Sequence, residues 1–520
     1  MNVVLISIDS LRRDVLEVYR DEPTGFGYQV ATPNLDRFAE RAAVFDTHYA
    51  GSLPCMPARR EWLTGTQEFL WRSWGPIEPF DAPIPRLARA SGIVTQLITD
   101  HYHYFQHGSH GYYEDFNGYE FVRGHEWDAH RTNPRTPPDR TFASQLNAET
   151  GAPSDLVNRT VYARNVADVA DEREYFAPRV FRRTAEWLTE NREWDEWFCY
   201  VDSFDVHEPF DVPESYASMY TDEPLDDSEL TIWPFYGRID GEGDGPDSPG
   251  GSGERLSDRQ VEFVTAQFAA KTTMTDRWFG RVLETLDEQE RWEDTMVIVT
   301  SDHGHYLGDH GWMGKPFAPI YDVLAHTPLF IWHPETARTG ETIDALTSAV
   351  DLYATILDAL GIDADRRHGR SLIPLLEGTT ERIREWAIYG YWGSSVNITD
   401  GRYTYLHPCE ADDPTYCYSA SMMNPYPDQF QPPRARPDAE CGSFLPYAEA
   451  PVWRYPAESH ARHADPLLFD VRTDPDQLTD LVGTDGETEI RMRGLLTEAL
   501  RELGAPQGQY DRLALSGRRT

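Results

Sequence analysis

The stretch TMVIVTSDH, from Thr295 to His303, joins a short apolar run rich in β-branched residues to an aspartate and a histidine. A run of this length and composition is typical of a buried strand. Four similar runs occur elsewhere in the chain, at Val3 to Ile8, Ile93 to Thr99, Trp197 to Phe204 and Pro328 to His333. Because helical patterns alternate with these runs, the sequence predicts an α/β fold with a large, mostly parallel sheet flanked by helices.

Acidic and histidine residues directly follow four of these five runs. In chain order they are Asp9, then Asp100, His101 and His103, then Asp205 and His207, and finally Asp302 and His303. In an open parallel sheet, ligands bind beyond the carboxyl ends of the strands. The sequence therefore predicts that these residues point one site at one edge of the sheet.

The charge of the chain limits its partners. Asp and Glu number 87 against 47 Lys and Arg, which gives a formal net charge of -40. This charge repels phosphates, so we expect neither nucleic acid nor a membrane surface as a partner. Lysine occurs only at Lys271 and Lys315, and arginine supplies the remaining positive charge. Such a composition is typical of proteins from halophiles, whose charged surfaces stay soluble in high salt.

No targeting segment, membrane span or cysteine framework is evident in the sequence. The first residues, MNVVLISIDS, lack a basic start and a cleavage site, and no apolar stretch approaches the roughly 18 to 20 residues of a membrane span. We therefore expect a cytoplasmic protein. The five cysteines include no CxxC pair, which argues against a zinc site. One local disulfide among Cys409, Cys417 and Cys441 remains open at this point.

The chain divides into two predicted parts near Thr380. Residues 1–380 form the large catalytic part, which closes with a helix around Asp351 to Leu360. Residues 381–520 form a smaller α+β subdomain with a small antiparallel sheet and a helix around Glu487 to Leu503. The Gly-, Asp- and Pro-rich stretch from Arg238 to Arg255 predicts an exposed loop.

The segment CMPAR, from Cys55 to Arg59, followed by REWLTG, resembles the signature of the sulfatase family in the alkaline phosphatase superfamily. Five further segments resemble that family in the same order: SIDSLRRD, TPNLDRFAERAAVF, DSFDVHEPFDVP, SDHGHYLGDHGWMGK and LLFDVRTDPDQLTDL. The resemblance implies an alkaline-phosphatase-like fold with a small C-terminal subdomain. It also implies that a maturation enzyme oxidises Cys55 to formylglycine, whose hydrate attacks sulfur and later expels sulfate from a hemiacetal.

The resemblance further implies one divalent metal ion, held by Asp9, Asp302, His303 and the modified side chain of Cys55. Hard oxygen ligands suit Ca²⁺ or Mg²⁺, and an imidazole admits Mn²⁺. We expect Ca²⁺. One position departs from the family pattern, because Ser10 stands where many sulfatases carry a second acidic residue.

The resemblance implies roles for several other residues around the sulfate group. Arg59 would hold the nucleophile and the metal-site carboxylates, while His101 and His103 match a Lys-x-His pair that contacts the sulfate and the nucleophile. Because His101 replaces a lysine, we expect a pH-sensitive site near neutrality. His207 would contact the sulfate as a general acid, and Lys315 would bind the transferred group and help to protonate the leaving oxygen. His310 is a further substrate-binding candidate, and the aromatic segment from His101 to Asp128 a candidate substrate wall.

The sequence thus predicts metal-dependent hydrolysis of a sulfate monoester, on a small molecule or a saccharide. A phosphonate hydrolase, or a phosphate mono- or diester hydrolase, of the same superfamily is the alternative, since the site chemistry is shared. A third possibility is a catalytically silent binding protein in which Cys55 stays a thiol.

Overall fold

The computed structural model describes most of the chain of 520 residues. The described ranges are 1–20, 26–132, 161–227, 229–241, 255–316, 319–336, 338–409, 414–426, 429–431, 433–457 and 465–515.

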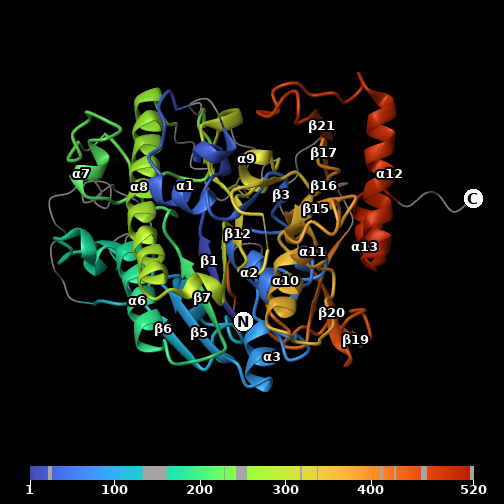
Figure 1. The fold of residues 1–520 in the computed structure, drawn as a ribbon. Coiled ribbons are helices and arrows are strands. Elements are labelled where there is room, and N and C mark those ends of the chain that lie inside the picture. The colour runs from blue at the N-terminus through green and yellow to red at the C-terminus, as the bar shows by residue number, and fades with distance from the viewer. Residues whose placement is uncertain are drawn as a thin grey trace, which may run out of the picture.

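An eight-stranded sheet crosses the middle of the molecule (Figure 1). Its strand order is β13 (Thr342–Ile343), β2 (Ala43–Phe45), β12 (Leu329–Trp332), β9 (Thr295–Thr300), β1 (Asn2–Ile8), β7 (Trp197–Ser203), β5 (Val94–Thr99) and β6 (Gly118–Phe121). All five predicted strands belong to this sheet. Strands β9, β1, β7, β5 and β6 run parallel, and β12 runs antiparallel to both of its neighbours. The predicted α/β fold with a mostly parallel sheet is confirmed.

Helices cover both faces of this sheet. Val4 and Ile6 of β1 pack in one core with α8 (Asp258–Glu288), α6 (Phe176–Glu190) and α1 (Pro33–Ala39). Val3 and Leu5 of the same strand face a second core with α2 (Cys55–Thr64), α3 (Ile84–Ala90) and α10 (Asp351–Ala359). Successive side chains of a strand point to opposite faces, so continuous apolar runs are required where both faces are covered. The carboxyl ends of β1, β5, β7 and β9 meet at one edge.

A five-stranded sheet lies between the central sheet and the C-terminal helix α12 (Gly486–Glu502), on the side of the molecule away from α8 (Figure 1). Its order is β21 (Leu467–Asp470), β17 (Tyr403–His407), β16 (Val396–Thr399), β15 (Ala387–Tyr391) and β4 (Ser52–Leu53). Strand β4 comes from the N-terminal part and pairs in parallel with β15. The boundary near Thr380 stays a prediction. A boundary there would divide the five-stranded sheet, because β4 comes before Thr380 and the other four strands come after it.

The remaining helices and strands are short. They are β3 (His48–Tyr49), β8 (Gly237–Arg238), β10 (Tyr306–Leu307), β11 (Trp312–Gly314), β14 (Thr347–Ser348), β18 (Thr415–Ser419), β19 (Glu440–Gly442), β20 (Val452–Ala457), α7 (Glu214–Ala217), α9 (Asp322–Ala325), α11 (Ile373–Leu376) and α13 (Gln507–Arg512). Of the predicted loop from Arg238 to Arg255, residues 242–254 lie outside the described residues. All five cysteines are described and all are free thiols, so the local disulfide is not formed. Within the described ranges, no helix combines the length and the apolar character needed to cross a bilayer.

Candidate active site

Helix α2 presents Cys55 at its first position, separated from β4 by Pro54 alone. The backbone N–H of Ser52 in β4 donates to Glu61 of α2 over 2.7 Å, which ties the strand to the helix. Gly51 is required here, because a Cβ at this position would lie 2.0 Å from the carboxylate of Glu61. The start of α2, and with it the position of Cys55, is therefore fixed by contacts with the preceding strand.

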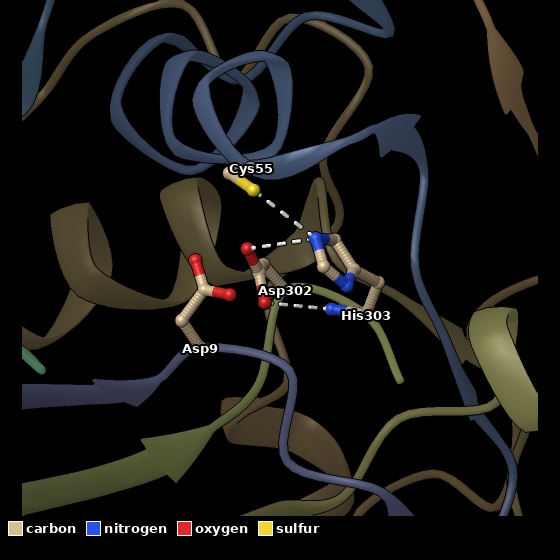
Figure 2. Close-up of side chains that lie close together, drawn as sticks. All are labelled: Asp9, Cys55, Asp302 and His303. Atoms are coloured by element: carbon tan, nitrogen blue, oxygen red, sulfur yellow. Dashed lines mark hydrogen bonds and ion pairs between the residues drawn. The ribbon is translucent and has the colours of Figure 1, made fainter. Parts of the chain in front are cut away.

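Four side chains from three segments converge at the carboxyl edge of the sheet (Figure 2). One potential ligand atom from each of Asp9, Cys55, Asp302 and His303 lies within 4.8 Å of the others, and all four residues are buried. His303 Nε2 lies 3.3 Å from Cys55 Sγ and 3.3 Å from Asp302 Oδ2. Its Nδ1 lies 2.8 Å from the carbonyl oxygen of Gly304, which only accepts, so Nδ1 carries the proton. Nε2 therefore turns a lone pair toward Cys55 Sγ and Asp302 Oδ2.

Arg59 contacts three carboxylates in and beside this cluster, those of Asp9, Asp202 and Asp302. Its Nη2 lies 2.9 Å from Asp9 Oδ2, and its Nη1 donates to Asp302 and, over 3.0 Å, to the carbonyl of Cys55. Nε and Nη2 also donate to the two oxygens of Asp202 over 2.9 and 2.8 Å. Such a forked pairing fixes the plane of the guanidinium. Asp202 was missed in the sequence, although an acid inside the apolar run WFCYVDSF is a signal that could have found it.

Burial and neighbouring charges act in opposite directions on the ionisation of Asp9 and of Cys55. Burial raises the pKa of the Asp9 carboxyl, but Arg59 and Lys315 outweigh burial and hold this pKa below its usual value. Burial and the charge of Asp9 raise the pKa of the Cys55 thiol well above its usual value. Cys55 is thus held as a thiol and not as a thiolate, so the unmodified side chain is a poor nucleophile.

Ser10, at the position where the family pattern often has a second acid, bonds to two of the site carboxylates. Its hydroxyl donates to Asp9 Oδ1 over 2.7 Å, and its backbone N–H donates to Asp302 Oδ1 over 3.1 Å. This second bond requires the backbone to turn at Ser10, which has a φ of 60°. Ser10 therefore orients the two carboxylates without adding a charge.

His101 and His103 follow β5 and lie near Asp9 and Glu126. His101 Nε2 is 3.6 Å from Asp9 Oδ2, and His103 Nε2 is 3.8 Å from Glu126 Oε2. The expectation that His101 titrates near neutrality is wrong, because burial and the charge of Arg59 lower its pKa well below the usual value. Burial also lowers the pKa of His103 to about 3. Both rings are neutral. The N–H of His103 is at Nδ1 and donates to Gln106 Oε1 over 2.6 Å, whereas neither ring nitrogen of His101 has a hydrogen-bond partner among the described residues. His101 therefore keeps an N–H that can donate, and His103 presents a lone pair at Nε2.

His207 and Lys315 differ in charge. Burial and the nearby ammonium of Lys315 lower the pKa of His207 well below its usual value. Burial lowers the pKa of Lys315, but the surrounding acidic groups outweigh burial and raise this pKa above its usual value. The ammonium of Lys315 is buried and makes no hydrogen bond within the described residues. A charged, unpartnered ammonium beside the cluster is suited to binding an anion.

His310 is the one predicted site residue that the structure does not bring to this cluster. Its ring stacks on Tyr321 with 3.6 Å between ring centroids. It lines a separate cavity of about 700 Å³ together with Arg12 and Asp46. Among the described residues, no hydrogen bond, ion pair or ring contact joins His310 to the residues around Cys55, so its role in substrate binding stays a prediction.

Lys271, on α8, clamps the segment that carries His207. Its ammonium donates to the backbone carbonyls of His207 and Pro209 over 2.6 and 2.8 Å and pairs with Asp205 Oδ1 at 2.6 Å. Asp205 also faces His125 Nε2 at 2.8 Å. In the sequence, Lys271 stands out only as one of two lysines, and this rarity is the signal that could have identified it as a supporting residue of the site.

We expect Lys271→Met to lower the free energy of unfolding by about 3 kcal/mol or more, because it leaves the buried charge of Asp205 without its cation. The lost bond to the His207 carbonyl should also lower kcat by about ten- to a hundredfold. Thermal melts and steady-state kinetics measure the two effects. Lys271→Arg should recover part of the stability, and adding Asp205→Asn to Lys271→Met should recover more. Equal stability of parent and Lys271→Met would contradict the clamp.

A family model shows the family of this chain, and curated relatives and solved structures are similar to it over most of its length. A family model described as Sulfatase matches residues 1–362. The chain is 26% identical to the multifunctional alkaline phosphatase superfamily protein PehA of Trinickia caryophylli, over 93% of this chain and 91% of that protein. It is 26% identical to an arylsulfatase of Clostridium perfringens, over 75% of this chain and 80% of that protein. The solved phosphonate monoester hydrolase of Agrobacterium radiobacter has a TM-score of 0.62 at 21% identity, covering 98% of this chain and 96% of that one.

Proposed function

Because this chain belongs to the sulfatase family and is a sulfuric ester hydrolase, we propose that it cleaves a sulfate monoester at the cluster around Cys55. The observation that supports this site most directly is the position of the unpartnered Lys315 ammonium near Asp9, Cys55, Asp302 and His303. A sulfate ester is an anion, and its hydrolysis needs cationic groups that neutralise its oxygens. Because the chain is an enzyme, a role as a catalytically silent binding protein is set aside.

The donor set fits the divalent metal ion that the family implies. Asp9 and Asp302 offer carboxylate oxygens, and His303 offers the Nε2 lone pair that faces them. When bound there, the ion would neutralise sulfate oxygens and lower the pKa of a coordinated hydroxyl group. The mixed oxygen and nitrogen donors suit Ca²⁺, Mg²⁺ or Mn²⁺, and we propose Ca²⁺.

Cys55 fits the formylglycine that the family implies, because it begins α2 and its side chain lies together with those of Asp9, Asp302 and His303. A formylglycine hydrate supplies one hydroxyl for attack on sulfur and a second whose deprotonation releases sulfate. Arg59 would hold Asp9 and Asp302 in place around this side chain through the contacts described above. The maturation enzyme that produces the modification is part of the same proposal.

Lys315 and the three histidines would bind the sulfate group and handle protons. The ammonium of Lys315 would donate to a sulfate oxygen, with His101 as a neutral donor. His103 donates its Nδ1–H to Gln106, so its Nε2 would accept a proton or a hydrogen bond. His207 Nδ1 lies 2.7 Å from the carbonyl oxygen of Glu208, which leaves Nε2 as its reacting atom. An anion bound beside this ring favours the imidazolium, which would let His207 protonate the leaving oxygen.

A second candidate function is the hydrolysis of phosphate or phosphonate esters. It is favoured by the similarity, over 93% of the chain, to a relative described as a multifunctional member of the alkaline phosphatase superfamily. We expect a sulfate monoester to have a higher kcat/KM than the phosphate or phosphonate ester of the same alcohol. Assays with the esters in competition measure this ratio, and a ratio below one would favour the second candidate.

The mass of a peptide tests the conversion of Cys55 to formylglycine. We expect the mass of the peptide that contains Cys55, isolated from protein made in its own host, to show the loss of one sulfur and two hydrogens and the gain of one oxygen. An unmodified thiol in fully active enzyme would contradict the formylglycine proposal. The halophilic host and the cytoplasmic location stay predictions from the sequence, and stability that rises with KCl concentration would support the former.

A further inference from the structure

The cavity that His310 lines is distinct from the cluster around Cys55. It has a volume of about 700 Å³, and none of the four clustered residues belongs to its walls. The walls combine the segment that follows β1, the loop at Asp309 and C-terminal residues between Val471 and Leu478. A volume in this range is typical of sites for small organic molecules. The chain therefore has room for a second ligand outside the proposed catalytic cluster.

Most of the charged side chains in these walls are paired with one another. Six aspartates and four arginines line the cavity. The ion pairs among them are Arg12 with Asp14 and Asp309, Arg13 with Asp46, and Arg20 with Asp476. The other three, Asp322, Asp344 and Arg472, form no ion pair with an arginine, a lysine or a carboxylate among the described residues. The walls therefore offer open charges of both signs.

Asp322 is a buried carboxylate that has no cation of its own. It is 7% exposed, and its Oδ1 accepts no hydrogen bond within the described ranges, while its Oδ2 accepts from the Tyr49 hydroxyl over 2.8 Å. His326 Nδ1 lies 3.7 Å from Oδ2, but this ring is neutral, because burial lowers its pKa well below the usual value. Burial raises the pKa of Asp322 to about 7. A ligand that brings a cation to this carboxylate would gain a charge-assisted hydrogen bond.

We propose that this cavity binds a small zwitterion such as an amino acid, with its ammonium group on Asp322 and its anionic group on Arg472. The inference goes beyond the sulfatase function and does not depend on it. An amine without an acidic group would leave Arg472 unpaired, and an anion without an ammonium group would face Asp322 and Asp344 without a compensating charge. A molecule that carries both charges satisfies both kinds of open group.

The arrangement of the ligand atoms argues against a divalent metal ion as the occupant. Such an ion needs several protein oxygens or nitrogens around one point. Among the described residues, no group of three potential ligand atoms close enough to share an ion includes Asp322. The size of the cavity also exceeds what a single ion fills, so an organic cation fits better.

The test measures the binding of matched probes to the full chain by isothermal titration calorimetry. The probes are the ω-amino acids from glycine to 6-aminohexanoate, each with the amine and the carboxylic acid that lack the opposite charge. For the best zwitterion we expect at least about tenfold tighter binding than for its matched acid, because Asp322 is buried, and at least about threefold tighter binding than for its matched amine, because Arg472 is exposed.

Two variants assign the two halves of the ligand. Asp322→Asn should weaken binding of the zwitterion by about tenfold or more, and its amide can still accept from Tyr49. Arg472→Gln changes an exposed side chain, so it should fold normally and lose the preference for the zwitterion over the amine. Asp276→Asn is the matched control, because Asp276 is a buried carboxylate of α8 whose pKa burial raises to about 6, and it lies outside these walls. It should bind the probes as the parent does.

Each alternative occupant predicts a different result. Equal affinity of the parent for a zwitterion and its amine would reduce the cavity to a cation site and overturn the role of Arg472. Unchanged affinity in Asp322→Asn, or no binding of any probe at about 10 mM, would overturn the site itself. Cys55→Ser should bind the probes as the parent does, and loss of binding there would place the probes in the catalytic cluster and contradict a separate site.

Discussion

Cys55→Ser should release at most one equivalent of alcohol per enzyme molecule and then stop, with steady-state kcat lower by more than about a thousandfold. A serine hydroxyl at the start of α2 would occupy the position of Cys55 Sγ, near His303 and the site carboxylates. It could attack sulfur once, because attack needs only one oxygen. The resulting ester has no second hydroxyl to expel sulfate, and the buried site has no group assigned to activate water. Burst kinetics and the mass of the sulfated peptide measure both parts of this result.

Cys199→Ser is the matched control for this experiment. Cys199 is fully buried in β7 and does not belong to the cluster around Cys55. The same change of sulfur to oxygen there should leave multiple turnovers intact, even if stability falls. Sustained turnover by Cys55→Ser near the parent rate would show that water clears the intermediate, and it would favour the phosphatase-like alternative.

The sequence predicted five of the eight strands of the central sheet, β1, β5, β7, β9 and β12, because burial on both faces leaves a continuous apolar run. The convergence of the residues that directly follow these runs was also predictable. Parallel strands end at one edge of a sheet, and this brings Asp9 and Asp302 together. Strand β4 was not predictable, because two residues carry no periodic pattern and its partner β15 lies more than 300 residues later. The pairing of β4 with β15 depends on how distant parts of the chain pack together, which a local sequence pattern does not reveal.

The ionisation states were the least predictable part of the site. An exposed histidine titrates near neutrality, and the sequence offered no measure of how completely His101 is buried. Asp202 and Lys271 were missed as supporting residues because each acts on another residue, Arg59 or Asp205, that is distant in sequence.

Asp302→Asn should raise the metal dissociation constant by about a hundredfold or more and reduce activity in proportion when metal is limiting. The change removes the charge of one of the two carboxylates in the cluster. Ser10 and Arg59 bond to different oxygens of Asp302, so the single amide oxygen can keep one of these two hydrogen bonds. A ligand at a hundred times its dissociation constant stabilises the folded state by about 2.7 kcal/mol. At the metal concentration that gives this effect in the parent, the variant should show less than about a quarter of it, measured by thermal melts with and without chelator.

Asp351→Asn separates loss of metal binding from general loss of stability. Asp351 is a fully buried carboxylate on α10 that pairs with Arg384, much as Asp302 pairs with Arg59, but it has no place in the cluster around Cys55. Its variant should unfold more easily yet gain as much stability from metal as the parent does. If Asp302→Asn gained the same metal-dependent stability as the parent, the ion would bind elsewhere and the assignment of Asp9, Asp302 and His303 as its ligands would be wrong. If chelation left the parent fully active, no ion would be needed at this site, and Lys315 and Arg59 would have to neutralise the sulfate alone.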